Sequence, residues 1–284
     1  MHGAQNGISV EMRRRNASMR ALARDFKEML AEQWEYRELL YQMTLRDLLV
    51  RYKQTIMGFG WAVFMPLVNT VLFSVIFTRV APLNTDVPYP LFSYTGLLFW
   101  NFFASSLRFA VSSLSGNANL VTKIYFPREI FPFSAILVCL VDLAVGSTVL
   151  IALMIYYQVA PGPAILFVPV LLVIQILLTA GIALLVAMAN LFLRDIKYFF
   201  EVALTIWMFA TSVVYPVELV GGKLGTLMKL NPMTPIIDGY RATILRGELP
   251  PLGPLAVAAV LAVAAVLAGW LVFHRAEYQF AEYA

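Results

Sequence analysis

The sequence has 284 residues, of which 60% are hydrophobic and only 13% are charged. Soluble domains carry roughly 25% charged residues, and the mean hydropathy of +0.75 also argues against a soluble protein. The net charge of +4 comes from basic residues that gather near the ends of apolar segments rather than along one polar face. This placement is typical of membrane topology and argues against a nucleic-acid partner. The chain is therefore predicted to be an all-α integral membrane protein.

The first part of the chain divides into a basic tail, residues 1–32, and an amphipathic segment, residues 33–56. The tail contains several arginines but no apolar core of the signal-peptide type, so we expect no cleaved signal and a cytoplasmic N-terminus. The amphipathic segment is too charged to cross a bilayer, and it is predicted to form a helix at the cytoplasmic interface. That helix either anchors the first span or takes part in gating or lipid contact. Its helical stripe consists of Trp34, Tyr41, Leu45, Leu48 and Tyr52.

Residues 57–284 contain six stretches that are long and apolar enough to span a bilayer, which takes about 20 residues. The connections on the side of the N-terminus hold fifteen Lys and Arg residues, and those on the opposite side hold five. Because basic residues favour the cytoplasmic side, both termini are predicted to be cytoplasmic. The six predicted spans are residues 57–80, 91–113, 130–157, 164–190, 198–217 and 253–273.

Two connections have unusual sequences. The predicted cytoplasmic loop 117–129 places charged residues beside a proline between two apolar runs. The predicted external segment 218–252 is semi-apolar and is interrupted by NPMTP, so we expect two short re-entrant helices joined at Asn231 to Pro235. Irregular backbone at membrane depth is tolerated only where it is buried in protein or lines a cavity. The segment is therefore a candidate external gate, with a simple surface cap as the alternative.

Reactive side chains do not cluster in the sequence. His2 and His274 stand at opposite ends of the chain, so we expect neither a metal cluster nor a Cys/His dyad. No phosphate-binding loop is present, because GGKLGT lacks the required spacing and context. We expect no catalytic, cofactor or metal site in this chain, so any ATP and Mg²⁺ would be bound by another polypeptide.

Three ionisable residues fall inside predicted spans: Asp142, Arg108 and Glu201. A lone charge in hydrocarbon costs at least about 2.5 kcal/mol on insertion scales, so such residues are candidates for function. Asp142 either forms hydrogen bonds between helices or contacts a transport path.

Aromatic residues are abundant in and beside the spans. They either pack against lipid and helices, or form platforms on which sugar rings stack inside a lumen. The candidate channel aromatics are Trp61, Phe64, Phe99, Trp100, Trp207 and Tyr215.

Four separated stretches, taken together, resemble the transmembrane subunit of type-2 ABC exporters of polysaccharides, the group that serves O-antigen, capsule and teichoic acid export. They are LRDLLVRYKQTIMGFGWAVFMPLV (45–68), KIYFPREIFP (123–132), NLFLRDIKYFFEVALTIWMFATSVVYP (190–216) and LNPMTPIIDGYRATIL (230–245). The resemblance implies a homodimer of six-span subunits in the bacterial inner membrane, paired with two cytoplasmic nucleotide-binding ABC subunits. Such an assembly would move a polyprenyl-diphosphate-linked polysaccharide outward.

The resemblance also implies roles for particular residues. The loop that docks on the ATPase corresponds to Asn117, Lys123, Tyr125, Phe126, Pro127, Arg128 and Glu129. The cytoplasmic entrance corresponds to Arg46, Asp47, Arg51, Tyr52 and Lys53, and the external re-entrant motif to Asn231, Pro232 and Pro235. Of these, Arg51 and Lys53 are candidates for attracting a lipid diphosphate. We further expect Asn117 to cap a short helix, and Arg128 and Glu129 to contact the partner.

Other functions remain open at this point. Within the exporter class, the substrate could be a capsule polysaccharide, teichoic acid or another hydrophobic molecule. An enzyme acting on polyprenyl lipids would need paired acidic residues for a metal, but Asp195 stands isolated beside Arg194. An ion-coupled carrier has only Asp142 in its favour.

Overall fold

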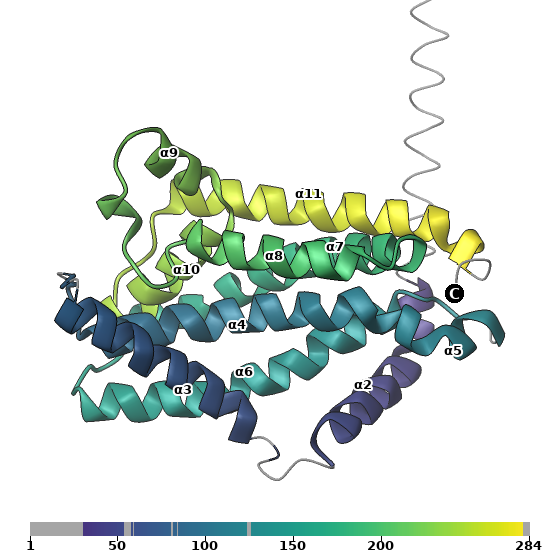
Figure 1. The fold of residues 1–284 in the computed structure, drawn as a ribbon, viewed down its shortest axis with the longest axis horizontal. Coiled ribbons are helices and arrows are strands. Elements are labelled where there is room, and N and C mark those ends of the chain that lie inside the picture. The colour runs from purple at the N-terminus through teal and green to yellow at the C-terminus, as the bar shows by residue number, and fades with distance from the viewer. Residues whose placement is uncertain are drawn as a thin grey trace, which may run out of the picture.

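The computed structural model describes residues 31–53, 58, 60–80, 82–83, 85–123 and 126–280. Within these ranges the chain is helical and contains no strand, as predicted. The predicted basic tail lies almost entirely outside the described residues. The long helices run side by side along the molecule and alternate in direction (Figure 1).

The helices follow the predicted segments closely. They are α2 (Arg37–Tyr52), α3 (Gly60–Val75), α4 (Tyr89–Ser113), α5 (Ala118–Lys123), α6 (Ile130–Tyr156), α7 (Val168–Phe192), α8 (Ile196–Phe209), α9 (Gly222–Leu230), α10 (Met233–Arg241) and α11 (Leu252–Ala276). Single turns of 3-10 helix occupy Ser115–Asn117, Pro163–Phe167, Val217–Leu219 and Glu277–Gln279. Turns of π-helix extend α3 over Ile76–Val80 and α10 over Ala242–Arg246.

Four segments of the described chain have the length and hydropathy of a membrane span: Val63–Val80, Ile130–Tyr156, Pro163–Phe192 and Leu252–Ala276. A fifth is α4, which qualifies together with Ser115–Lys123, a helical segment bent from it by 44°. The protein therefore crosses the membrane several times.

The predicted span at 198–217 is not a single helix. Helix α8 has 14 residues and ends at Phe209, which makes it about 21 Å long. The hydrocarbon core is about 30 Å thick. Residues 210–214 form turns instead, because their carbonyl groups are bound by side chains from another part of the chain.

That binding comes from Arg241, whose side chain is buried at the end of α10. Its guanidinium donates hydrogen bonds to the carbonyl oxygen of Ser212 and, at 2.6 Å, to that of Val213. It also lies over the ring of Phe92, 3.6 Å from the ring centre, and 3.2 Å from the Asp238 carboxylate. A buried charge requires such partners, and here they fix the turn after α8 against α4.

Helix α4 forms the centre of the core. Its aromatic and aliphatic residues are buried around most of its circumference, as expected for a helix surrounded by others. Tyr94 donates a hydrogen bond of 2.9 Å to the carbonyl oxygen of Gly146 in α6. Gln175 of α7 donates one of 2.8 Å to the carbonyl oxygen of Phe99. These bonds tie α4 to α6 and α7 through backbone carbonyl groups.

Helices α7 and α11 approach each other at two glycines. A Cβ atom added to Gly181 would collide with the backbone of Ala265, and one added to Gly269 would collide with the backbone of Gly181. Small residues allow close backbone contact between membrane helices. The two helices therefore pack backbone to backbone at this level.

The segments predicted to be cytoplasmic gather at one end of the molecule, and the predicted external segment lies at the other. Figure 1 shows α5 and the final turns of α11 at one end and α9 at the opposite end. The two short helices α9 and α10, which break at Asn231 and Pro232, confirm the predicted pair of helices in 218–252.

We expect Gly269→Ala to destabilise the fold by about 1–3 kcal/mol, because the methyl group would force α7 and α11 apart. Gly253→Ala is the matched control, since it lies in the same helix and nothing is within 4 Å of an added Cβ. The control should be neutral or slightly stabilising. Thermal unfolding of both variants in detergent checks this, and equal midpoints would contradict the close packing.

Candidate functional site

A cavity of about 670 Å³ opens between α2, α3, α4, α6 and α8. Its lining brings together residues that lie far apart in the sequence. Two are predicted entrance residues, two are predicted channel aromatics, and two are ionisable residues of predicted spans: Arg51, Tyr52, Trp61, Trp100, Arg108 and Asp142. The cavity thus combines cationic and aromatic side chains.

On one side of the cavity, the end of α2 is joined to α6. The Arg51 guanidinium lies 2.7 Å from the Asp142 carboxylate and 4.2 Å from the ring centre of Phe109. The Tyr52 hydroxyl donates a hydrogen bond to the same carboxylate. Burial, together with this bond, raises the pKa of the Tyr52 hydroxyl, so it remains a donor. Asp142 therefore has the interhelical role that was one of its two predicted alternatives.

On the other side, Arg108 of α4 pairs with Glu201 of α8 at 2.9 Å. Both side chains are substantially exposed, so this pair can open at little cost. Asp142, Arg108 and Glu201 thus each have an opposite charge beside them.

Five of the six predicted channel aromatics lie at three locations. Trp61 and Phe64 are exposed on α3 and contact each other edge to face. Trp100 and Trp207 lie together between α4 and α8, with ring centres 6.5 Å apart. Phe99 is buried, and its ring is stacked on Tyr240.

Tyr215 donates a hydrogen bond from its hydroxyl to the carbonyl oxygen of Phe209, at the end of α8. A lumen role stays a prediction for all six aromatics, although packing already accounts for Phe99.

Asn231, a predicted gate residue, joins the α9–α10 corner to the end of α8. Its side chain accepts a hydrogen bond of 2.9 Å from Trp207 and donates one of 2.7 Å to Thr211. Pro232 precedes α10, and Pro235 lies in its first turn. Hydrogen bonds therefore join the α9–α10 corner to Trp207 and to the end of α8.

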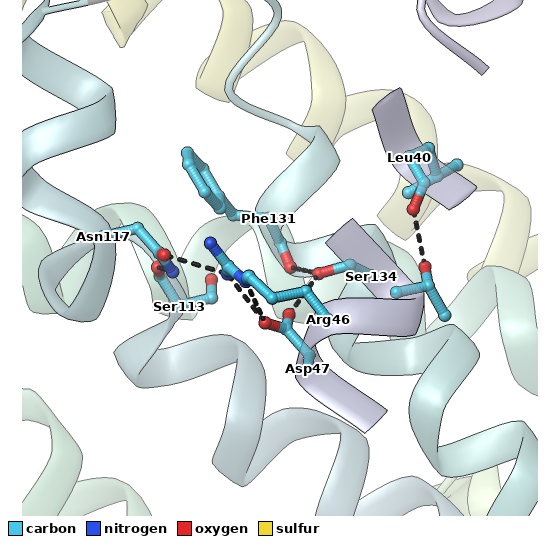
Figure 2. Close-up of polar contacts among 8 residues, drawn as sticks. Leu40, Arg46, Asp47, Ser113, Asn117, Phe131 and Ser134 are labelled. Carbon is cyan, nitrogen blue, oxygen red and sulfur yellow. Dashed lines mark hydrogen bonds and ion pairs between the residues drawn. The ribbon is translucent and has the colours of Figure 1, made fainter. Parts of the chain in front are cut away.

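The predicted entrance and docking segments meet through a polar network, shown in Figure 2. Arg46 donates hydrogen bonds to Asp47 at 2.7 Å and to Asn117 at 2.9 Å. Ser134 of α6 donates one of 3.0 Å to Asp47. Asn117 donates to the carbonyl oxygen of Ser113, so it closes the end of α4 as well as preceding α5. Lys53 is exposed just after α2.

The predicted docking loop is divided by burial. Asn119, Thr122 and Lys123 of α5 are exposed, whereas Phe126 is buried against Phe131. Pro127 is also buried, and Tyr125 lies outside the described residues. The exposed part of the loop is therefore α5.

Arg128 and Glu129 do not reach outward as predicted for contacts with a partner. Only 11% of the Arg128 side chain is exposed, and its guanidinium lies 3.1 Å from Glu277 near the C-terminus. Glu129 is 1% exposed and lies near Trp270 and His274 of α11. Burial, the largest effect, raises the pKa of the Glu277 carboxyl, and neighbouring Glu129 raises it further. Arg128 and Glu129 therefore hold the end of α11 and the turn that follows it against the start of α6.

Sequence reasoning missed two arrangements. Arg241 lies in the stretch 230–245, and no role was predicted for it. The signal that could have identified it is a single basic residue among apolar neighbours. His274 was set aside because the other histidine of the sequence, His2, stands at the opposite end. In the structure it lies between the carboxylates of Glu129 and Glu277.

Known proteins match most of the length of this chain. A family model described as ABC-2 type transporter matches residues 38–245. The chain is 28% identical over 257 residues to the O-antigen export system permease protein RfbA of Myxococcus xanthus, a match that covers 89% of this chain and 98% of the relative. It is also 28% identical over 247 residues to a protein of the same name from Klebsiella pneumoniae, covering 86% of this chain and 94% of the relative. The chain therefore belongs to the ABC-2 type transporter family.

Proposed function

We propose that this chain is the membrane-spanning permease subunit of an ATP-driven exporter that moves polyprenyl-diphosphate-linked polysaccharide of the O-antigen type outward across the bacterial inner membrane. The observation that carries the proposal is the match, over nearly the full length of the relatives, to permeases named for O-antigen export. The family membership makes the chain a transport component rather than an enzyme.

The cavity has the chemistry that such a substrate needs. Arg51 and Arg108 can attract a diphosphate, because guanidinium groups bind phosphate oxygens in a bidentate manner. Trp61 and Trp100 offer apolar faces to sugar rings. A diphosphate entering here would compete with Asp142 and Glu201 for the two arginines, so substrate binding would loosen the links from α2 to α6 and from α4 to α8.

The arrangement of exposed surfaces supports the proposed assembly and orientation. Helices α3 and α8 expose apolar side chains such as Val71, Leu72, Phe199 and Ile206. These faces suit membrane lipid and a second copy of the chain. With α2, α5 and both termini in the cytoplasm, α9 and α10 would face outward as the re-entrant gate, and α8 with the turns after it would complete a sixth crossing.

ATP and Mg²⁺ would be bound by two separate nucleotide-binding subunits, and α5 is the surface proposed to meet them. Through Asn117 and Arg46, α5 is linked to α2, which carries Arg51 at the cavity. Closure of the ATPase could therefore be passed to the cavity through α2.

Arg51→Ala is expected to lower export about tenfold or more, because it removes a cavity cation and leaves Asp142 without its opposite charge. Arg37→Ala, on the same helix but away from the cavity, is the matched control and should export normally. The measurement is surface O-antigen in a deletion strain complemented with each variant, normalised to the amount of protein in the membrane. Normal export by a fully inserted Arg51→Ala protein would count against the cavity as the substrate path. If the intact chain itself restores no surface O-antigen, the proposed substrate is wrong.

Lys123→Glu is expected to reduce the amount of ATPase that copurifies with the chain severalfold, because it reverses a charge on the exposed face of α5. Lys223→Glu makes the same change on α9, at the opposite end of the molecule, and serves as the control. Copurification and stimulated ATP hydrolysis are measured for both. Equal values for the two variants would remove α5 from the docking surface.

A further inference from the structure

Three ligand-type residues meet where the start of α6 touches the end of the chain. Glu129 precedes α6, His274 lies in the last turn of α11, and Glu277 begins the 3-10 turn that follows. One ligand atom from each residue lies within 4.8 Å of the others. About 145 residues of sequence separate Glu129 from the other two, so only the fold brings them together.

The distances within this cluster resemble those between metal ligands more than those of hydrogen bonds. His274 Nδ1 is 3.4 Å from Glu129 Oε1 and 3.7 Å from Glu277 Oε2. A charge-assisted N–H to carboxylate bond is about 2.7–2.9 Å long. Two ligands bound tetrahedrally to one ion at about 2.1 Å stand roughly 3.4 Å apart. The spacing therefore leaves room for an ion at the centre.

Of the eight buried side-chain atoms of the described residues that have no hydrogen-bond partner, two belong to residues of this cluster. They are Glu129 Oε2 and His274 Nδ1, and the Glu129 side chain is almost completely buried. A buried carboxylate oxygen without a partner is costly, and native proteins rarely leave one so. His274 Nδ1 lies 3.4 Å from Glu129 Oε1, so a cation bound between these residues would satisfy the imidazole nitrogen, and a carboxylate that binds the ion through both oxygens would satisfy Glu129 Oε2 as well.

Neighbouring donors orient the two carboxylates. Trp270 Nε1 donates to Glu129 Oε1 at 3.3 Å. The Arg128 backbone N–H and guanidinium donate to Glu277 Oε1 at 3.0 and 3.1 Å. Glu277 Oε2 is therefore left facing His274. For Glu277 the donors thus hold the oxygen that faces away from His274, and donors that fix the far oxygen of a ligating carboxylate are a regular feature of metal sites.

We propose that Glu129, His274 and Glu277 bind one divalent transition-metal ion, with Zn²⁺ the best match. The imidazole nitrogen disfavours Mg²⁺ and Ca²⁺, which prefer oxygen ligands alone. Three protein ligands leave the fourth position of a Zn²⁺ ion to water. The ion holds the end of α11 against the start of α6. This start is the point where the chain enters α6 after leaving α5. Metal binding at this site does not depend on which substrate the protein exports.

The test uses the full-length protein, purified in detergent through a tag without histidine and stripped with a chelator. Zn²⁺ is added in slight excess and bound metal is counted by mass spectrometry after gel filtration, while Co²⁺ is titrated and followed by its visible absorption. We expect one ion per chain and a thermal midpoint that rises with Zn²⁺ and falls with chelator. His274→Ala and Glu129→Gln should each weaken Co²⁺ binding at least tenfold.

His2→Ala is the matched control, because the sequence contains only these two histidines. It should bind one ion like the wild type. Glu277→Gln provides a third ligand variant if either of the other two is not recovered in folded form. Failure of the wild-type protein to retain Zn²⁺, or retention unchanged in every folded ligand variant, overturns the site.

Discussion

The fold depends on a buried charge at the centre of the α8 to α10 region. Arg241 supplies several donors, and carbonyl oxygens from the turn after α8 and from α4 accept them. The charge cannot be left unsatisfied in an apolar interior, and the Ser212 and Val213 carbonyl groups that accept from it lie in turns rather than in a continuation of α8. As a result α8 stops early, the following turns pack inward, and the α9–α10 corner lies against Trp207. Asn231 completes this arrangement, because its side chain binds Trp207, Thr211 and the Ala210 carbonyl group at the end of α8.

Most of the helical architecture was predictable from hydropathy and helix breakers. Helices α6, α7 and α11 begin and end within a few residues of the predicted spans, because each is a long apolar run between polar or proline-bearing connections. The helix predicted over 198–217 stops at Phe209, because apolar composition cannot reveal a distant side chain that binds the backbone of the second half of this run. The Asn231 break was predictable because proline cannot continue a helix.

The residues of the site could be predicted from the sequence, but the contacts between them could not. Arg51 and Asp142 were both identified as unusual residues, yet nothing in the sequence indicates that they form an ion pair. The docking loop shows the converse problem. Lys123 and Arg128 are both basic residues of one loop, but the fold exposes the first and buries the second against Glu277. Burial depends on tertiary contacts, and composition cannot supply it.

The glycine contact between α7 and α11 determines which parts of the molecule can shift. Where two helices touch through their backbones, no side-chain rotamer can change to accommodate sliding, so the pair acts as a fixed frame. Helices α2 and α8 bury few residues, and ion pairs link them to α6 and α4. Rearrangement during a working cycle is therefore confined to one flank, where the cavity lies, while the opposite flank keeps its register.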